Sequence, residues 1–182
     1  QAIPAIVTSA FGYAGQKCSA ASRVIAVGPA FDELVDRLVG ATQLVPVGHA
    51  RQLSTVSGPL IDADSHARVT RYQDAAGREG TVVLRRDDVP EGGWYVGPTI
   101  VVIEDAGASV WREEIFGPVL AVMRADDLDH ALALANDTDY ALTGGIFSRS
   151  PSHIARAPAA LRAGNVYVNR GITGAVVGRQ PF

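Results

Sequence analysis

The amino-acid sequence predicts an α/β fold in which a mostly parallel, twisted sheet is flanked by helices. Short apolar runs of strand length alternate along the chain with longer segments in which apolar residues recur at helical spacing. Two of the runs, residues 99–103 and 119–123, are almost continuously apolar, as is typical of strands buried on both faces of a parallel sheet. The length of 182 residues fits one domain with a sizeable core, and the sequence contains no internal repeat.

The expected strands are short runs rich in β-branched and other apolar residues. They cover residues 22–27, 81–84, 99–103, 119–123, 144–148 and 165–168. Two stretches with several Gly and Pro residues, 45–60 and 87–97, are expected to be loops, and a short linking turn is expected near residues 110–111. No helix or strand is predicted before residue 22.

The expected helices cover residues 29–39, 62–76, 128–135 and 150–163. In the first of them, Phe31, Leu34 and Leu38 recur at the spacing of one helix face. Residues suited to a first turn or an N-terminal cap are Pro29, Asp62 or Asp64, Ser150 and Pro151. Gly77 and Gly164 are expected to end the second and fourth helices, and Pro158 is expected to kink the fourth.

The composition excludes several classes of partner. A net charge of −3 predicts no basic surface, so we expect no nucleic-acid partner. No apolar run approaches the roughly 20 residues that span a bilayer, so we expect no membrane partner. The single cysteine permits no internal disulfide, which favours a cytoplasmic protein, and the four scattered histidines predict no metal site.

Cys18 is the only cysteine of the chain. It lies between a loop with two glycines, Gly12 and Gly15, and the expected strand at residues 22–27. A thiol at the junction of a loop and a rigid element is both accessible and held in place, which suits a nucleophile. A lone free cysteine is more often a small buried hydrophobe without chemistry. The residues around Cys18 alone leave both interpretations open.

Three segments, spread over nearly the whole chain, favour the nucleophile. They are F-G-Y-A-G-Q-K-C-S-A around Cys18, R-E-E-I-F-G-P-V at residues 112–119, and the pair N-V-Y-V-N-R at 165–170 and G-A-V-V-G-R-Q-P-F at 174–182. In this order they resemble the catalytic-cysteine segment, the E-E-I-F-G-P segment and the substrate-end segment of the aldehyde dehydrogenase superfamily. Within the superfamily the resemblance is closest to the branch that oxidises L-glutamate γ-semialdehyde.

The resemblance implies that Cys18 is the catalytic nucleophile. Its thiolate would add to the aldehyde carbonyl, and hydride loss from this thiohemiacetal to the cofactor NAD would leave a thioester that water hydrolyses. The backbone N–H of Cys18 would donate to the oxyanion. Two interpretations of Lys17 stay open: its ammonium group favours the thiolate form of Cys18, or its side chain faces solvent.

The resemblance also implies two residues that bind NAD. Glu114 is expected to accept hydrogen bonds from the hydroxyls of the nicotinamide ribose, because a carboxylate can accept two bonds from a vicinal diol. Phe116 is expected to pack near the nicotinamide. Glu113 is assigned no role.

The substrate, an aldehyde, is expected to be held at its other end by a polar loop. The resemblance implies that Gly174 and Ala175 bind its α-carboxylate through their amides, that Ser19 donates its hydroxyl to the same group, and that Phe182 lines the aldehyde channel. An enzyme for simple aliphatic aldehydes would keep that end apolar.

Parts of the superfamily pattern are absent from this sequence. There is no E-L-G-G-K segment, which carries the general base, and no G-x-G-x-x-G for a pyrophosphate. The sequence also starts without Met and stops within the last motif. We therefore expect residues 1–182 to be an inactive fragment of a catalytic domain, from a parent that is a homo-oligomer. Two alternatives stay open: a parent that oxidises another aldehyde, and a purely structural or assembly module.

Overall fold

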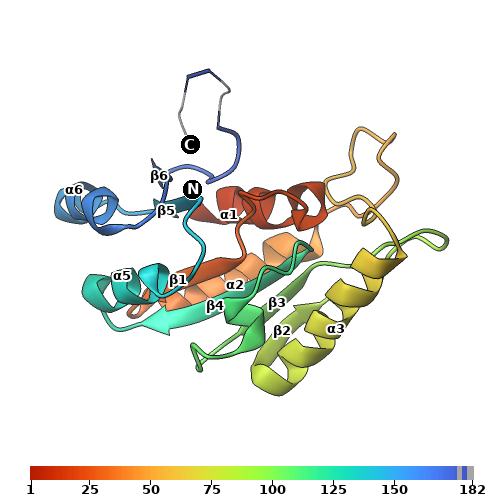
Figure 1. The fold of residues 1–182 in the computed structure, drawn as a ribbon, viewed down its shortest axis with the longest axis horizontal. Coiled ribbons are helices and arrows are strands. Elements are labelled where there is room, and N and C mark those ends of the chain that lie inside the picture. The colour runs from red at the N-terminus through yellow and green to blue at the C-terminus, as the bar shows by residue number, and fades with distance from the viewer. Residues whose placement is uncertain (176–177, 180–182) are drawn as a thin grey trace.

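The computed structural model describes residues 1–175 and 178–179, which form a four-stranded main sheet, a separate pair of strands and the helices around them (Figure 1). The strands are β1 (Arg23–Val27), β2 (Thr81–Arg85), β3 (Thr99–Val102), β4 (Val119–Ala125), β5 (Thr143–Ile146) and β6 (Asn165–Val168). The helices are α1 (Ala2–Phe11), the 3-10 helix η1 (Gly12–Gly15), α2 (Ala30–Gln43), α3 (Ala63–Glu79), α4 (Ser109–Arg112), α5 (Leu128–Asn136) and α6 (Pro151–Ala160).

The main sheet has the strand order β1-β4-β3-β2. β4 pairs in parallel with both β1 and β3, whereas β2 runs antiparallel to β3. β5 and β6 pair in parallel in a second sheet. The prediction of a mostly parallel sheet flanked by helices is confirmed.

β4 lies at the centre of the core. Leu120, Ala121 and Val122 are fully buried, and successive side chains of a strand point to opposite faces. Leu120 and Val122 pack in one cluster with Phe11 of α1 and with residues of α2, while Ala121 packs in the other with Val69 of α3. The sheet is therefore covered by α1 and α2 on one face and by α3 on the other, as Figure 1 shows.

Two helix starts agree with the sequence. The carboxylate of Asp62 accepts a hydrogen bond from the Ser65 N–H at 2.7 Å and caps α3. The hydroxyl of Ser150 accepts one from the His153 N–H at 3.4 Å, with Pro151 at the first position of α6. Both caps satisfy backbone donors that a helix start leaves open.

The helix α1 was not predicted. Its sequence, A-I-P-A-I-V-T-S-A-F, is apolar on most of its surface and lacks the clear stripe of a helix with one wet face. Val7, Ala10 and Phe11 are buried in the cluster formed with α2 and the sheet. Tertiary packing accounts for this helix better than its local pattern does.

Gly77 does not end α3, contrary to the prediction. A Cβ at Gly77 would meet no atom of the described residues within 4 Å, and the helix continues to Glu79. There the Glu79 carboxylate accepts a hydrogen bond from the N–H of Val110, at 3.0 Å, at the start of α4. The helix ends at Gly80, where a Cβ would lie 2.4 Å from the carbonyl oxygen of Val102. Close packing on β3 therefore decides the end of α3.

α6 ends at Ala160, so the prediction that Gly164 ends it is wrong. The side chain of Asn136, at the end of α5, donates to the Ala160 carbonyl at 2.9 Å and accepts from the Arg162 N–H at 2.8 Å. A residue from another helix thus caps α6. The helix runs two residues past Pro158.

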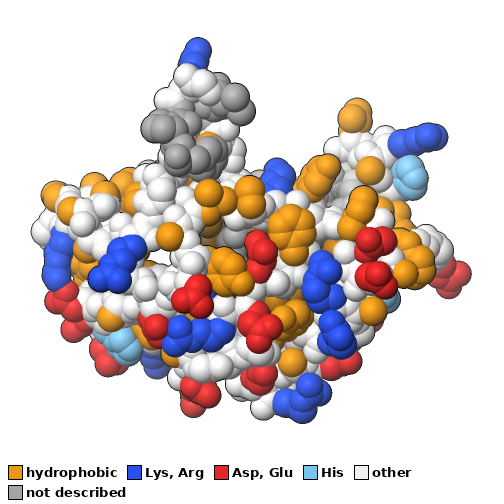
Figure 2. All heavy atoms as spheres, in the orientation of Figure 1, with side chains coloured by type: hydrophobic (Ala, Val, Ile, Leu, Met, Phe, Trp, Pro, Cys, Tyr) orange, Lys and Arg blue, Asp and Glu red, His pale blue; other side chains and the backbone are white. Residues whose placement is uncertain are grey.

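Charged side chains of both signs are mixed on one face of the molecule. On the face drawn in Figure 2, Lys and Arg lie among Asp and Glu and form no large basic patch. In the part of the chain that the structure describes, no three His, Cys, Asp or Glu side chains are grouped as a metal site would need. The helices of this part include none that is long and apolar enough to cross a membrane.

Candidate active site

Cys18 lies between η1 and β1, on a segment (residues 12–19) that we call the cysteine loop. Tyr13, Ala14 and Gly15 have φ angles of 61°, 54° and 67°, so three consecutive residues are left-handed. Left-handed residues other than Gly are strained and persist only where surrounding contacts hold them. Cys18 itself is exposed, so the interpretation of this residue as a buried hydrophobe is wrong.

The backbone around Cys18 leaves a donor available. The Ala20 N–H donates to the Lys17 carbonyl at 2.9 Å, which closes the turn. Among the described residues no acceptor contacts the Cys18 N–H, so this group can donate to an oxyanion on a bound substrate. The Lys17 ammonium lies 5.4 Å from the centre of the exposed Tyr13 ring, which favours the solvent-facing interpretation of Lys17.

Cys18, Glu114 and Phe116 line one cleft of about 680 Å³. The cleft runs between the main sheet and the second sheet, and every residue of β1 and of β5 contributes to its lining. Within the described residues, β1 pairs only with β4 and β5 only with β6, so the free edges of two strands face this space. The fold thus brings the predicted nucleophile and the two predicted cofactor-binding residues to one place.

Two glycines pack the cysteine loop against the segment that carries Phe116. A Cβ on Gly15 would lie 2.3 Å from the carbonyl oxygen of Gly117. A Cβ on Gly117 would lie 2.4 Å from a methyl carbon of Val69, which is fully buried in α3. The two segments can pack this closely because neither glycine has a side chain.

Glu114 and Phe116 present different chemistry to the cleft. Phe116 has a φ of 54° and is 38% exposed. The Glu114 N–H donates to the Tyr140 hydroxyl at 3.3 Å, whereas no donor among the described residues contacts the Glu114 carboxylate. This open carboxylate can accept two hydrogen bonds from a diol beside an apolar ring.

Contacts from α3 hold the segment around Glu114, and sequence reasoning missed them. The Tyr72 hydroxyl donates to the Glu113 carboxylate, and this hydrogen bond raises the pKa of Tyr72 to about 12. Arg68 donates from Nε to the Ile115 carbonyl at 3.3 Å. Glu113 therefore has a structural contact, which no local pattern indicated because Tyr72 is distant in the sequence.

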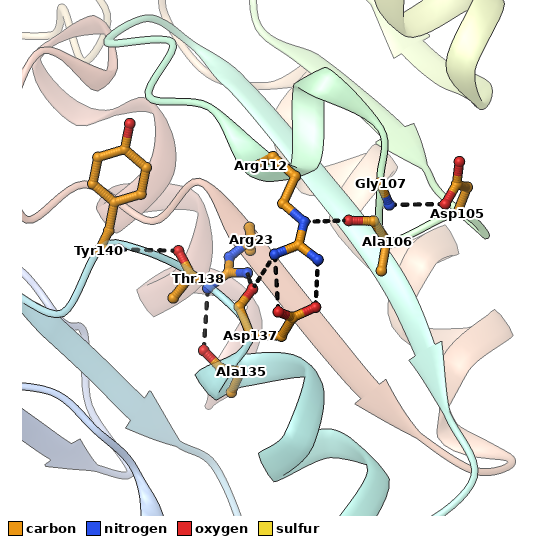
Figure 3. A network of polar contacts seen from close by, with 9 residues as sticks. All are labelled: Arg23, Asp105, Ala106, Gly107, Arg112, Ala135, Asp137, Thr138 and Tyr140. Carbon is orange, nitrogen blue, oxygen red and sulfur yellow. Dashed lines mark hydrogen bonds and ion pairs between the residues drawn. The ribbon is translucent and has the colours of Figure 1, made fainter.

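A second polar network lies beside the cleft (Figure 3). Arg112 forms a two-pronged ion pair with Asp137 and donates from Nε to the Ala106 carbonyl at 2.7 Å. Hydrogen bonding by Arg112 lowers the pKa of Asp137. Arg23 of β1 donates to the Ala135 carbonyl at 3.2 Å. These contacts join α4, the end of α5 and β1. Arg112 begins the R-E-E-I-F-G-P-V segment, but no pattern in the sequence indicated its partners or those of Arg23.

Of the residues predicted to bind the other end of the substrate, those that the structure describes do not line this cleft with Cys18. Ser19, Gly174 and Ala175 are not among the residues that line the cleft. Gly174 has a φ of 85°, and a Cβ there would meet no atom of the described residues within 4 Å. Phe182 lies outside the described residues. The role of these four residues in substrate binding stays a prediction.

The chain matches the aldehyde dehydrogenase family over residues 1–182, and it therefore belongs to that family. More particularly, it is 41% identical over 181 residues to 1-pyrroline-5-carboxylate dehydrogenase of Geobacillus sp. (strain WCH70). That alignment covers 100% of this chain and 35% of the relative, so the chain spans about a third of the length of the curated relatives it matches.

Solved structures agree with this membership. Proline utilization A (PutA) from Bdellovibrio bacteriovorus superimposes with a TM-score of 0.96 at 45% identity, over 100% of this chain and 19% of that one. A 1-pyrroline-5-carboxylate dehydrogenase from Thermus with bound NAD superimposes with a TM-score of 0.95 at 40% identity, over 100% of this chain and 35% of that one.

Proposed function

We propose that this chain is part of the catalytic domain of an NAD-dependent dehydrogenase in proline degradation. The reaction is the oxidation of L-glutamate γ-semialdehyde, the open form of 1-pyrroline-5-carboxylate, to L-glutamate. The observation that carries the proposal is the cleft shared by Cys18, Glu114 and Phe116, in a chain whose relatives bear the name of this reaction. Because the chain covers 35% of those relatives, we assign the activity to a longer protein, called the full-length enzyme below.

Cys18 supplies the nucleophile. Its thiolate attacks the aldehyde carbon, so that a C–S bond forms and the carbonyl oxygen becomes an oxyanion. The open N–H of Cys18 donates to this oxyanion and stabilises its charge. Held by Glu114 and Phe116, NAD would supply the acceptor for the hydride that has to leave the same carbon. Water then cleaves the thioester on Cys18, which releases the carboxylic acid and restores the thiol.

Glu114 and Phe116 fit the nicotinamide end of NAD. The Glu114 carboxylate is exposed and free of described donors, so it can accept bonds from both ribose hydroxyls. Phe116 offers an apolar ring on the same wall of the cleft. The contacts of Glu113 with Tyr72 and of Arg112 with Asp137 hold the backbone on which both residues lie.

Replacing Glu114 tests this cofactor site. In the full-length enzyme, Glu114→Gln is expected to raise the KM for NAD about tenfold, because a neutral amide oxygen accepts hydrogen bonds more weakly than a carboxylate. The KM for the aldehyde should stay the same. Glu104→Gln, at an exposed acid outside the cleft, is the matched control. An unchanged KM for NAD in Glu114→Gln would contradict the assignment.

The substrate's α-carboxylate is assigned to Ser19, Gly174 and Ala175. Gly174 has a positive φ, and none of the described residues lies within 4 Å of the position of a Cβ there, which supports a backbone that can meet a ligand closely. The Ser19 hydroxyl has no partner among the described residues and follows the nucleophile directly. A carboxylate held there would orient a substrate whose aldehyde meets Cys18.

The decisive experiment is NADH formation by the full-length enzyme with a panel of aldehydes. The panel comprises glutamate γ-semialdehyde, succinate semialdehyde and short aliphatic aldehydes. A strong preference for glutamate γ-semialdehyde is expected. Equal turnover of the others would keep the reaction class and reject the substrate, and no NADH with any aldehyde would reject the reaction. Residues 1–182 alone are expected to form no NADH, because the general-base and cofactor-binding segments are not in this sequence.

A further inference from the structure

The side chain of Gln16 joins the cysteine loop to a second loop, far away in the sequence. Its Nε2 donates to the Pro59 carbonyl at 3.1 Å, and its Oε1 accepts from the Ile61 N–H at 3.0 Å. Beside these bonds, the Tyr13 N–H donates to the Val56 carbonyl at 3.0 Å. Both polar ends of the Gln16 amide are therefore used to hold one loop on the other.

The second loop, residues 45–61, is itself fixed by hydrogen bonds. The Gly48 N–H donates to the Ser57 carbonyl at 3.0 Å, which closes the loop on itself. The Leu60 N–H donates to the Trp94 carbonyl at 2.8 Å, and the Leu60 side chain is buried in the core. Gln16 thus binds a loop that is itself anchored to the core through Leu60.

Gln16 also closes the strained turn that precedes the nucleophile. Its backbone N–H donates to the Tyr13 carbonyl at 3.1 Å, and its Nε2 approaches the same oxygen at 3.4 Å. Tyr13 and Ala14 are left-handed without being glycine, so this turn depends on its contacts. Cys18 follows two residues later, and its position depends on where this turn is held.

We propose that Gln16 is a positioning residue for the nucleophile. Its amide holds the cysteine loop on residues 59–61, so that the thiol and the N–H of Cys18 meet a bound carbonyl together. Gln16 is not among the residues that line the cleft and acts through the backbone. This inference rests on the proposed function, in which Cys18 is the nucleophile.

Two variants of the full-length enzyme test the proposal. Gln16→Met keeps the length of the side chain without its hydrogen bonds, and Gln16→Glu keeps the acceptor for Ile61 but loses the donor to Pro59. Gln43→Met, at the exposed end of α2, is the matched control. The measurements are the pre-steady-state burst of NADH, the KM for the aldehyde, the rate of Cys18 alkylation by iodoacetamide and the melting temperature.

The burst rate is expected to fall roughly 10- to 100-fold in both Gln16 variants, because a small misplacement of a reacting group is costly. The KM, the alkylation rate and the melting temperature should stay near the wild-type values, because a freely diffusing reagent needs no oriented thiol. An unchanged burst would overturn the proposal. An equal loss of burst and alkylation, or a lower melting temperature, would also overturn it, since Gln16 would then act on thiol ionisation or on folding. A burst that survives in Cys18→Ala would reject the proposed function itself, which separates the two failures.

Discussion

The cysteine loop and the residues around Gly174 are both expected to hold the substrate, but they contact their surroundings differently. In the cysteine loop, Gly15 lies against the Gly117 backbone and Gln16 binds a second loop through both ends of its amide. At Gly174, no atom of the described residues lies within 4 Å of the position of a Cβ. Attack on a carbonyl demands an accurately placed nucleophile, whereas a carboxylate anchor has to leave its amides open for the ligand. This difference agrees with a fixed position for the Cys18 thiol and accessible amides at Gly174 and Ala175.

The largest effect on activity is expected from a substitution in the cysteine loop. Cys18→Ala in the full-length enzyme should lower kcat at least about 10³-fold, because the covalent route is removed. NADH formation measures this loss, and NAD binding by isothermal titration should be unchanged. Activity within tenfold of the wild-type value would mean that the cysteine loop is arranged for something other than nucleophilic attack.

A pair of glycine substitutions compares the two loops directly. Gly15→Ala is expected to lower the free energy of unfolding by about 3 kcal/mol, because the new Cβ would both meet the Gly117 backbone and sit at a positive φ. Gly174→Ala has the positive φ but meets none of the described residues, so a loss of about 1 kcal/mol is expected. Equilibrium urea unfolding of the chain measures both values.

Gly40→Ala is the control for this pair. Gly40 lies inside α2 with ordinary helical geometry and no atom near its Cβ position, so alanine should stabilise the chain by about 0.5–1 kcal/mol. An equal loss of unfolding free energy in Gly15→Ala and Gly174→Ala would contradict this comparison. It would show that the approach of Gly15 to the Gly117 backbone has no extra effect on stability.

A smaller effect is expected from the anchor side. Ser19→Ala in the full-length enzyme should raise the KM for glutamate γ-semialdehyde about tenfold, because one hydrogen bond to a carboxylate is lost. The KM for pentanal, which has no carboxylate, should not change. Ser54→Ala, at an exposed serine in the loop at 45–61, is the control. A similar rise for both aldehydes would place Ser19 in support of the nucleophile instead.

The smallest effect concerns the contact of Tyr72 with Glu113, which holds the segment around Glu114. The hydrogen bond raises the pKa of Tyr72 to about 12, above the ordinary value of 10.0. The folded chain keeps this proton at pH values where the unfolded chain has lost it. The stability from this bond is therefore complete below pH 10 and is lost as the pH rises toward 12.

Urea unfolding of the chain across pH 8 to 12 tests this expectation. Tyr72→Phe should show a smaller fall in unfolding free energy over that range than the wild-type chain, while Tyr13→Phe, at an exposed tyrosine, should not. If the unfolding free energy of Tyr72→Phe falls with pH as steeply as that of the wild-type chain, the contact of Tyr72 with Glu113 does not stabilise the fold.

Several features could be predicted from short stretches of sequence. β6 has the predicted bounds, and β4 is buried on both faces as its apolar run indicated. Asp62 and Ser150 cap their helices because a cap depends only on the residues within one turn. In each case the signal and the structure that it determines lie within a few residues of one another.

Other features depended on residues far apart in the sequence. α1 forms where it can bury Phe11 against α2 and the sheet. α3 passes Gly77 because its next turn binds α4, and α6 is ended by Asn136 from α5. No window of ten residues contains both partners of such contacts, so a prediction from local pattern misplaced these boundaries.

The sequence by itself determined the family, the alternation of strands and helices, and the candidate residues Cys18, Glu114 and Phe116, because each rests on a short pattern of residue types. Only the tertiary structure decided that these three share one cleft, that Gly15 meets Gly117, and that Gln16 fastens the cysteine loop to residues 59–61. The physical reason is that close packing of segments far apart in the chain is set by the burial of the whole core, and one side chain's partner follows from where all the others have been placed.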